Sequence, residues 1–178
     1  GAAPAGAAAG RAPPRGPGVQ LGPFRPEHGR FRTAHGSPDD AFIVAYVGQQ
    51  GGHKGIDTLL AAFPELATTV QNAWLVIAGA TTPYSPQLRE LAAALPDDIR
   101  ARVVVLDDVG DDTRAELLAD CDVFASPSTQ EAFGITTLEA WSQAKPVVIG
   151  DTPSQRTVAA EGVSALLVTP GPAGPLPV

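Results

Sequence analysis

From about residue 41 to residue 168 the chain alternates short, mostly apolar runs with longer amphipathic stretches. The apolar runs are rich in Val, Ile, Leu and Ala, which is typical of strands buried on both faces of a sheet. They lie at 41–48, 74–80, 102–109, 122–128, 146–150 and 165–168. The intervening stretches place apolar residues three or four positions apart, which indicates helices with one buried face. These lie at 54–70, 85–95, 111–121, 135–144 and 153–160.

About six rounds of strand and helix predict right-handed βαβ units, and these place parallel strands under helices on both faces. The expected fold class is therefore α/β: a Rossmann-like, three-layer α/β/α domain with a parallel sheet. Pro64 lies inside the helix expected at 54–70 and should kink or split it. Trp74 and Trp141 are expected to pack either in the core or on the domain surface.

The first 40 residues have a different composition. Residues 1–18 contain only Gly, Ala, Pro and Arg, which cannot fill a core, and residues 19–40 remain rich in Pro, Gly and charge. Phe24 and Phe31 are among the few apolar anchors there. We predict a largely disordered linker over 1–40, one folded domain over 41–170 and a tail over 171–178.

Charge and composition exclude several classes of protein. The net charge of −7 argues against a nucleic-acid binder. No apolar run approaches the roughly 20 residues that span a bilayer, so any membrane association should be peripheral. The single cysteine, Cys121, cannot form an internal disulfide, which fits the cytoplasm. The three histidines lack metal-ligand spacing, so no metal site is expected.

The first loop with unusual content is "GQQGGHKG", residues 48–55, between the first strand and its helix. Its glycines allow a ligand to approach the backbone, and Lys54 stands where a cation opposes the helix dipole, at a cost of roughly 0.3–1 kcal/mol unless an anion lies beside it. The loop matches neither the Walker A pattern nor G-x-G-x-x-G. The alternative is a flexible loop with a solvated lysine.

The second such loop is "SPSTQEAFGITTLEA", residues 126–140, which follows the fourth strand. Gly134 lets the backbone turn, and the helix that begins beyond it offers free N–H groups to phosphate oxygens. Glu131 precedes this helix and Glu139 lies on its second turn, so both carboxylates can face the same end of the sheet. Carboxylates there suit the hydroxyls of a sugar or ribose. The alternative is that both acids are ordinary solvated charges.

Together the two loops resemble the donor-binding half of retaining, GT-B-fold glycosyltransferases, the group 1 family related to glycogen and sucrose-phosphate synthases. The resemblance covers about residues 41–169. It is carried by "VGQQGGHKGIDTLLAAF", "WLVIAGA", "DVFASPSTQEAFGITTLEAWSQAKPVV" and "EGVSALLV". The segment "GVQLGPFRP" (18–26) is similar to the stretch that leads from the acceptor domain into this one. The resemblance thus implies the C-terminal half of a GT-B fold, with the N-terminal acceptor-binding domain missing.

The resemblance also implies roles for individual residues. Lys54 would neutralise the leaving diphosphate, Glu131 would hold the sugar, and Glu139 would bind the ribose hydroxyls of a nucleotide-diphosphate sugar. No metal or other cofactor would be needed. The donor-binding residues it implies are Gly48, Gln49, Phe133, Gly134, Ile135, Thr136, Thr137 and Glu139.

The sequence departs from the family pattern at Gln49, where many members have an arginine that grips the diphosphate. The expected function is sugar transfer with retention by a chain that is incomplete in isolation. One alternative is a non-catalytic nucleotide-binding or interaction module of the same fold. A nucleotide-sugar epimerase would need a catalytic acid or histidine in the cleft, and a dinucleotide dehydrogenase would need the glycine fingerprint that is missing here.

Overall fold

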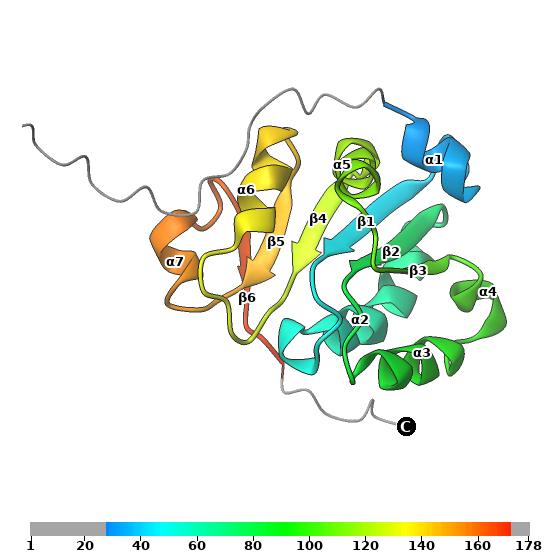
Figure 1. Ribbon diagram of the computed structural model, residues 1–178, viewed down its shortest axis with the longest axis horizontal. Helices are drawn as coiled ribbons and strands as arrows, with labels where there is room; N and C mark the ends of the chain where they lie inside the picture. The colour runs from blue at the N-terminus through cyan, green and yellow to red at the C-terminus, as the bar shows by residue number, and fades with distance from the viewer. Residues whose placement is uncertain (1–27, 172–178) are drawn as a thin grey trace, which may run out of the picture.

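The computed structural model describes residues 28–171, which form a six-stranded parallel sheet flanked by helices (Figure 1). The predicted α/β, Rossmann-like class is confirmed. The strands run in the order β3-β2-β1-β4-β5-β6. They are β1 (Phe42–Val47), β2 (Ala73–Gly79), β3 (Val103–Asp107), β4 (Val123–Ser126), β5 (Val147–Gly150) and β6 (Leu166–Val168). The helices are α1 (Arg30–His35), α2 (Ile56–Thr69), α3 (Ser85–Ala93), α4 (Asp97–Arg100), α5 (Asp111–Asp120), α6 (Ile135–Ser142) and α7 (Gln155–Val158), with a 3₁₀ turn η1 (Gly52–Lys54).

Two apolar cores lie on opposite faces of the sheet, because successive side chains of a strand point in opposite directions. On β1, Ile43 and Val47 join the core beneath α1, α5 and α6, whereas Val44 and Tyr46 join the core beneath α2, α3 and α4. Figure 1 shows α5 and α6 on one side of the sheet and α2 and α3 on the other. This three-layer arrangement explains why the strands read as continuous apolar runs.

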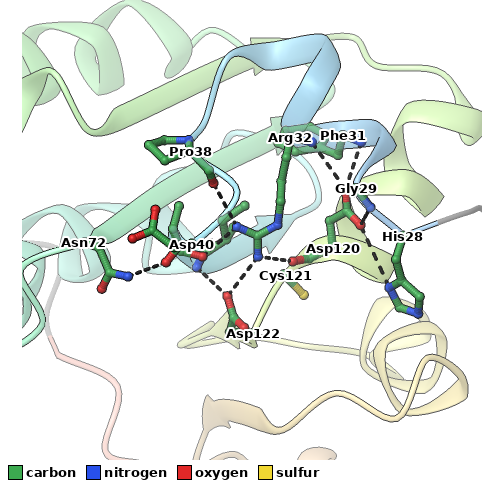
Figure 2. Close-up of polar contacts among 12 residues, drawn as sticks. His28, Gly29, Phe31, Arg32, Pro38, Asp40, Asn72, Asp120, Cys121 and Asp122 are labelled. Carbon is green, nitrogen blue, oxygen red and sulfur yellow. Dashed lines mark hydrogen bonds and ion pairs between the residues drawn. The ribbon is translucent and has the colours of Figure 1, made fainter.

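The folded part begins earlier than the predicted boundary near residue 41. Residues 30–35 form helix α1, and its Phe31 is fully buried in the core. The carboxylate of Asp120, at the end of α5, accepts hydrogen bonds from the backbone N–H groups of Gly29 (2.6 Å), Phe31 (2.9 Å) and Arg32 (3.3 Å) (Figure 2). The linker prediction was wrong for this segment because tertiary contacts hold a helix that its own sequence does not favour. Residues 1–27 and 172–178 lie outside the described part of the chain.

The side chain of Arg32 ties the same segment to the start of β1. Its guanidinium donates to the backbone carbonyls of Ala41 (2.6 Å) and Asp120 (2.9 Å) and pairs with the Asp122 carboxylate at 3.3 Å. Asp122 in turn accepts the N–H of Ile43 at 2.7 Å (Figure 2). Arg32, which lies in the segment predicted to be a linker, therefore holds that segment to the folded domain.

Two local details differ from the sequence-based expectations. Helix α2 runs unbroken past Pro64, so it is not split in two. It continues because Phe63 and Ala67, on either side of the proline, are buried against the sheet. The short helix α4 was not expected. Trp74 and Trp141 pack against the core, which is one of the two placements expected for them. Within residues 28–171, no helix is long and apolar enough to cross a membrane.

The strand order reverses between β1 and β4, which are adjacent although α2, β2, α3, α4, β3 and α5 separate them in sequence. They pair in parallel with Val44 opposite Val123. The loop after β1 leads to α2 on one face, and the loop after β4 leads to α6 on the other. In open α/β sheets a ligand crevice lies at this kind of reversal, beyond the carboxyl ends of the strands.

Candidate functional site

The loops that follow β1 and β4 pack directly against each other at the reversal point. The carbonyl of His53 accepts hydrogen bonds from the Thr129 N–H (2.9 Å) and hydroxyl (3.1 Å). Gly55 has φ +69°, and a Cβ added to it would lie 2.3 Å from the Pro127 carbonyl oxygen. Glycine is required at this position both by the backbone conformation and by the close approach of the second loop.

Lys54 and Glu131, one from each loop, form the central charge pair of this crevice. The Lys54 Nζ lies 3.0 Å from Glu131 Oε2, and each side chain is 18% exposed. Glu131 Oε1 accepts hydrogen bonds from the backbone N–H groups of Ala132 (3.1 Å) and Gly134 (3.2 Å). Burial alone would raise the pKa of Glu131, but the hydrogen bond and charge of Lys54, with the backbone N–H groups, outweigh it and lower that pKa. Glu131 is therefore ionised at neutral pH.

The pair opens onto a cleft of about 650 Å³. Its other walls come from the loop after β4 and from the loop after β5. The sequence had not pointed to the loop after β5 as part of a site. The Ser154 hydroxyl donates to the Glu131 carbonyl, and the Thr152 and Ser154 hydroxyls are 3.1 Å apart. The lining residues are His53, Lys54, Thr129, Gln130, Glu131, Ala132, Thr152, Pro153 and Ser154. The signal for Thr152 and Ser154 was their place after a strand next to β4, at the same edge of the sheet.

Gly134 and the first turn of α6 bring backbone donors to the same region. Gly134 has φ +74°, and a Cβ there would approach Gln155 Nε2 to 2.9 Å and Thr137 Oγ1 to 3.2 Å. Thr137 is buried and Thr136 half-buried. The first N–H groups of α6 have no carbonyl partner within the helix, and the helix dipole makes this end favourable for an anion. Phe133 is 45% and Ile135 40% exposed.

Glu139 lies on the side of α6 that faces α5 and does not line the Lys54–Glu131 cleft. Its Oε1 is 3.2 Å from Arg114 Nη2, whereas its Oε2 is buried and has no hydrogen-bond donor. Burial raises the pKa of Glu139, the charge of Arg114 opposes that rise, and Asp111 adds to it. Glu139 is therefore not an ordinary solvated charge, which was the alternative for this residue. The sequence analysis missed Arg114.

The loop after β1 contributes mainly backbone. Gly48 is half-buried, and Gln49 is exposed while its carbonyl accepts the Tyr46 hydroxyl at 2.7 Å. The neighbouring Gln50 is fully buried and donates to Asp107 Oδ1 at 2.9 Å. In the described part of the chain, no group of three or more His, Cys, Asp or Glu residues could hold a metal ion.

Comparison with known protein families and relatives gives consistent matches. The family model described as "Glycosyl transferases group 1" matches residues 28–174. A glycosyltransferase of Methanocaldococcus jannaschii, itself uncharacterised, is 34% identical over 140 residues, which are 79% of this chain and 35% of that protein. The D-inositol 3-phosphate glycosyltransferase of Xylanimonas cellulosilytica is 32% identical over 160 residues, 85% of this chain and 38% of that protein. The chain therefore spans little more than a third of the length of these relatives.

Solved structures give the same fold. The Anabaena protein Alr3699/HepE, in complex with UDP and glucose, superposes with a TM-score of 0.66 at 25% identity over 80% of this chain and 38% of that one. The C-terminal domain of the group 1 glycosyl transferase LpcC from Francisella tularensis superposes with a TM-score of 0.74. That match covers 88% of this chain and 82% of the domain, and at 17% identity it bears on the fold alone.

Proposed function

The chain belongs to the glycosyl transferases group 1 family, and we propose that it forms the nucleotide-sugar donor site of a retaining glycosyltransferase. The observation that carries this proposal is the position of the Lys54–Glu131 pair. The pair lies at the reversal of strand order, in a cleft beside the N-terminal turn of α6. A cation and a helix N-terminus side by side suit a diphosphate, and a carboxylate among hydroxyl-bearing residues suits a sugar.

In the proposed reaction the bond between the anomeric carbon and the β-phosphate oxygen breaks, and its electron pair stays on the phosphate. The Lys54 ammonium and the first N–H groups of α6 stabilise the charge that develops there. These groups are fixed before the reaction starts, so no solvent reorganisation is required. The acceptor hydroxyl attacks the anomeric carbon from the side that the diphosphate leaves, and its proton passes to the departing phosphate. The configuration is therefore retained without a metal ion.

Glu131 is proposed to hold the sugar. Its two oxygens are already oriented, one by Lys54 and one by the backbone of Ala132 and Gly134. A carboxylate oxygen accepts more than one hydrogen bond, so sugar hydroxyls can be added without breaking these contacts. The hydroxyls of Thr129, Thr152 and Ser154 surround the same space. A hydroxyl-rich hexosyl group fits this lining.

Glu139 is proposed to bind the ribose hydroxyls, and the remaining donor-binding residues to contribute mainly backbone. UDP is the first nucleotide to test, because the Anabaena relative is in complex with UDP and glucose. The acceptor and the groups that bind it are proposed to lie in other parts of a longer glycosyltransferase. We expect the isolated chain to bind nucleotide but to transfer sugar slowly or not at all.

A non-catalytic nucleotide-binding module is the second candidate. Gln49 favours it, because an exposed amide there supplies no charge to the diphosphate. Hydrolysis of UDP-glucose separates the two: a slow turnover by the wild type that is lost in Lys54→Ala indicates a catalytic donor site. Because an incomplete enzyme can also bind without turnover, a second assay adds a separately produced acceptor-binding half. Restored transfer then indicates a catalytic donor site, and binding that stays without turnover indicates the inert module.

Calorimetric titration with UDP, GDP, ADP and dTDP, without added metal, tests the donor site directly. One nucleotide should bind in preference, and Lys54→Ala and Glu139→Ala should each weaken it by at least about tenfold, since charge-assisted contacts are worth roughly 1.5–3 kcal/mol. Lys145→Ala and the exposed Glu90→Ala are matched controls outside the crevice. If the wild type binds none of the four nucleotides, the proposed donor site is wrong.

A further inference from the structure

We propose that Arg114 is a positioning residue that holds Glu139 in the orientation that selects ribonucleotides over 2′-deoxyribonucleotides. This inference rests on the proposed nucleotide site and adds to it a residue of α5. Arg114 lies on the helix next to α6, and its Nη2 is 3.2 Å from Glu139 Oε1.

The ion pair fixes only one of the two carboxylate oxygens. Oε2 of Glu139 is buried and has no donor within hydrogen-bond distance in the described structure. A buried acceptor without a donor destabilises the fold, so this oxygen is not placed there for stability. The side chain as a whole is still 21% exposed. A small shift of the side chain would let a ribose hydroxyl donate to the free oxygen while Arg114 keeps the other.

Arg114 also pairs with a second carboxylate. The same Nη2 atom lies 3.3 Å from Asp111 Oδ1, one turn earlier on α5. The guanidinium is only 36% exposed and so bridges a solvent-exposed acid and a half-buried one. Without it, Glu139 would face Asp111 with no cation between them. The repulsion would favour protonation of Glu139 or a swing into water, and either change removes the oriented acceptor.

The experiment compares the affinities for UDP and 2′-deoxy-UDP by calorimetry in the wild type, Arg114→Gln, Arg114→Lys and Glu139→Ala. If the wild type prefers another base, the ribo and deoxy diphosphates of that base replace this pair. The wild type should bind the ribonucleotide at least about tenfold more tightly, the value of a hydrogen bond to a charged group. In Arg114→Gln this preference should fall to within about threefold, while the affinity for 2′-deoxy-UDP stays within about twofold of the wild type.

The retained deoxynucleotide affinity shows that the variant is folded and that its diphosphate site is intact. Arg114→Lys keeps a cation and should restore a preference of several-fold. The double variant Arg114→Gln/Glu139→Ala should lower the preference for UDP over 2′-deoxy-UDP no further than either single change, since both act through one carboxylate. Arg100→Gln is the matched control, because Arg100 pairs with Asp97 at the same i,i+3 spacing on the unrelated helix α4.

The possible failures are distinct. If the wild type and Arg114→Gln show the same preference for UDP over 2′-deoxy-UDP, or if the wild type shows none, the role of Arg114 is wrong. The proposed donor site is not contradicted by that result. A wild type that binds no nucleotide overturns the donor site and this inference together.

Discussion

At the scale of single residues, the Lys54–Glu131 pair shows how a part-buried charge is kept ionised. Burial favours the neutral acid, while the ammonium 3.0 Å away and two backbone N–H groups favour the carboxylate, and the second set prevails. The pair is intermediate between exposed pairs, worth about 0–1 kcal/mol, and buried ones, whose breakage costs about 3–5 kcal/mol.

Lys54→Met should therefore destabilise the fold in a pH-dependent manner. The pKa of Glu131 is lowered in the wild type, so its contribution to stability is complete above the ordinary range of a glutamate and is lost as the pH falls through that lowered pKa. In the variant only the backbone N–H groups oppose the effect of burial, so the same pKa rises relative to the wild type. The difference in unfolding free energy should be about 1–2 kcal/mol at pH 7 and shrink towards pH 3. Urea unfolding at several pH values measures it, and a difference that does not change with pH contradicts the argument.

The sequence predicts the charged residues of the site better than their partners. Lys54 and Glu131 stand out because each is a charged residue in a glycine-containing loop that follows a strand, and such loops meet at one edge of a parallel sheet. Arg114 could not be found in this way, because its partner Glu139 lies on the next helix and nothing in the spacing shows which faces of α5 and α6 meet.

At the scale of elements, helix α1 depends on one acidic side chain from another helix. Asp120 is 1% exposed as a side chain and accepts three backbone N–H groups at the start of α1, as Figure 2 shows. A six-residue helix has little stability of its own, so these bonds and the burial of Phe31 must supply it.

Asp120→Ala should cost roughly 3 kcal/mol or more, because it leaves three backbone donors without their charged acceptor. Residues 29–33 should then exchange their amide hydrogens faster while the sheet stays protected. Urea unfolding and hydrogen exchange measure the two effects. Asp112→Ala, on the exposed face of the same α5, is the control and should cost less than about 1 kcal/mol. Unchanged exchange at 29–33 would show that α1 is held by its apolar contacts alone.

Gly55 joins the two loops of the crevice, so its substitution should damage both. In Gly55→Ala the left-handed backbone alone costs about 1–2 kcal/mol, and the new methyl group also meets the Pro127 carbonyl at 2.3 Å. Gly162 has nearly the same φ, +67° against +69°, but no atom within 4 Å of an added Cβ. Gly162→Ala should therefore show only the backbone cost. Equal losses of unfolding free energy in the two variants would mean that the loops move apart at little cost.

The elements themselves could largely be predicted from the periodicity, and the errors have physical causes. Pro64 did not split α2, because the buried residues around it hold both halves to the sheet. Helix α1 was predicted to be linker, because a short Arg-containing stretch between Gly29 and Gly36 gives no sign of the distant Asp120. Both errors arise where tertiary contacts override local propensity.

At the scale of the whole molecule, the alternation of strands and helices implies a parallel sheet but not the order of its strands. The order 3-2-1-4-5-6 places the loops after β1 and β4 beside each other, and that reversal creates the crevice. The glycines and charged residues of the sequence pointed to the same two loops without the strand order. The loop after β5 became part of the site only once β5 was placed beside β4.

This topology predicts which segments a bound nucleotide protects from amide hydrogen exchange. Because the proposed ligand contacts both sides of the reversal, UDP should slow amide hydrogen exchange at 48–55 and at 129–139 together. Residues 85–100, which form α3 and α4 at the far edge of the sheet in Figure 1, should exchange as before. At a hundred times its dissociation constant, UDP should also raise the unfolding free energy by about 2.7 kcal/mol. Protection confined to one of the two loops would mean that the ligand does not bridge the reversal, and a donor site that needs both Lys54 and Glu139 would then be excluded.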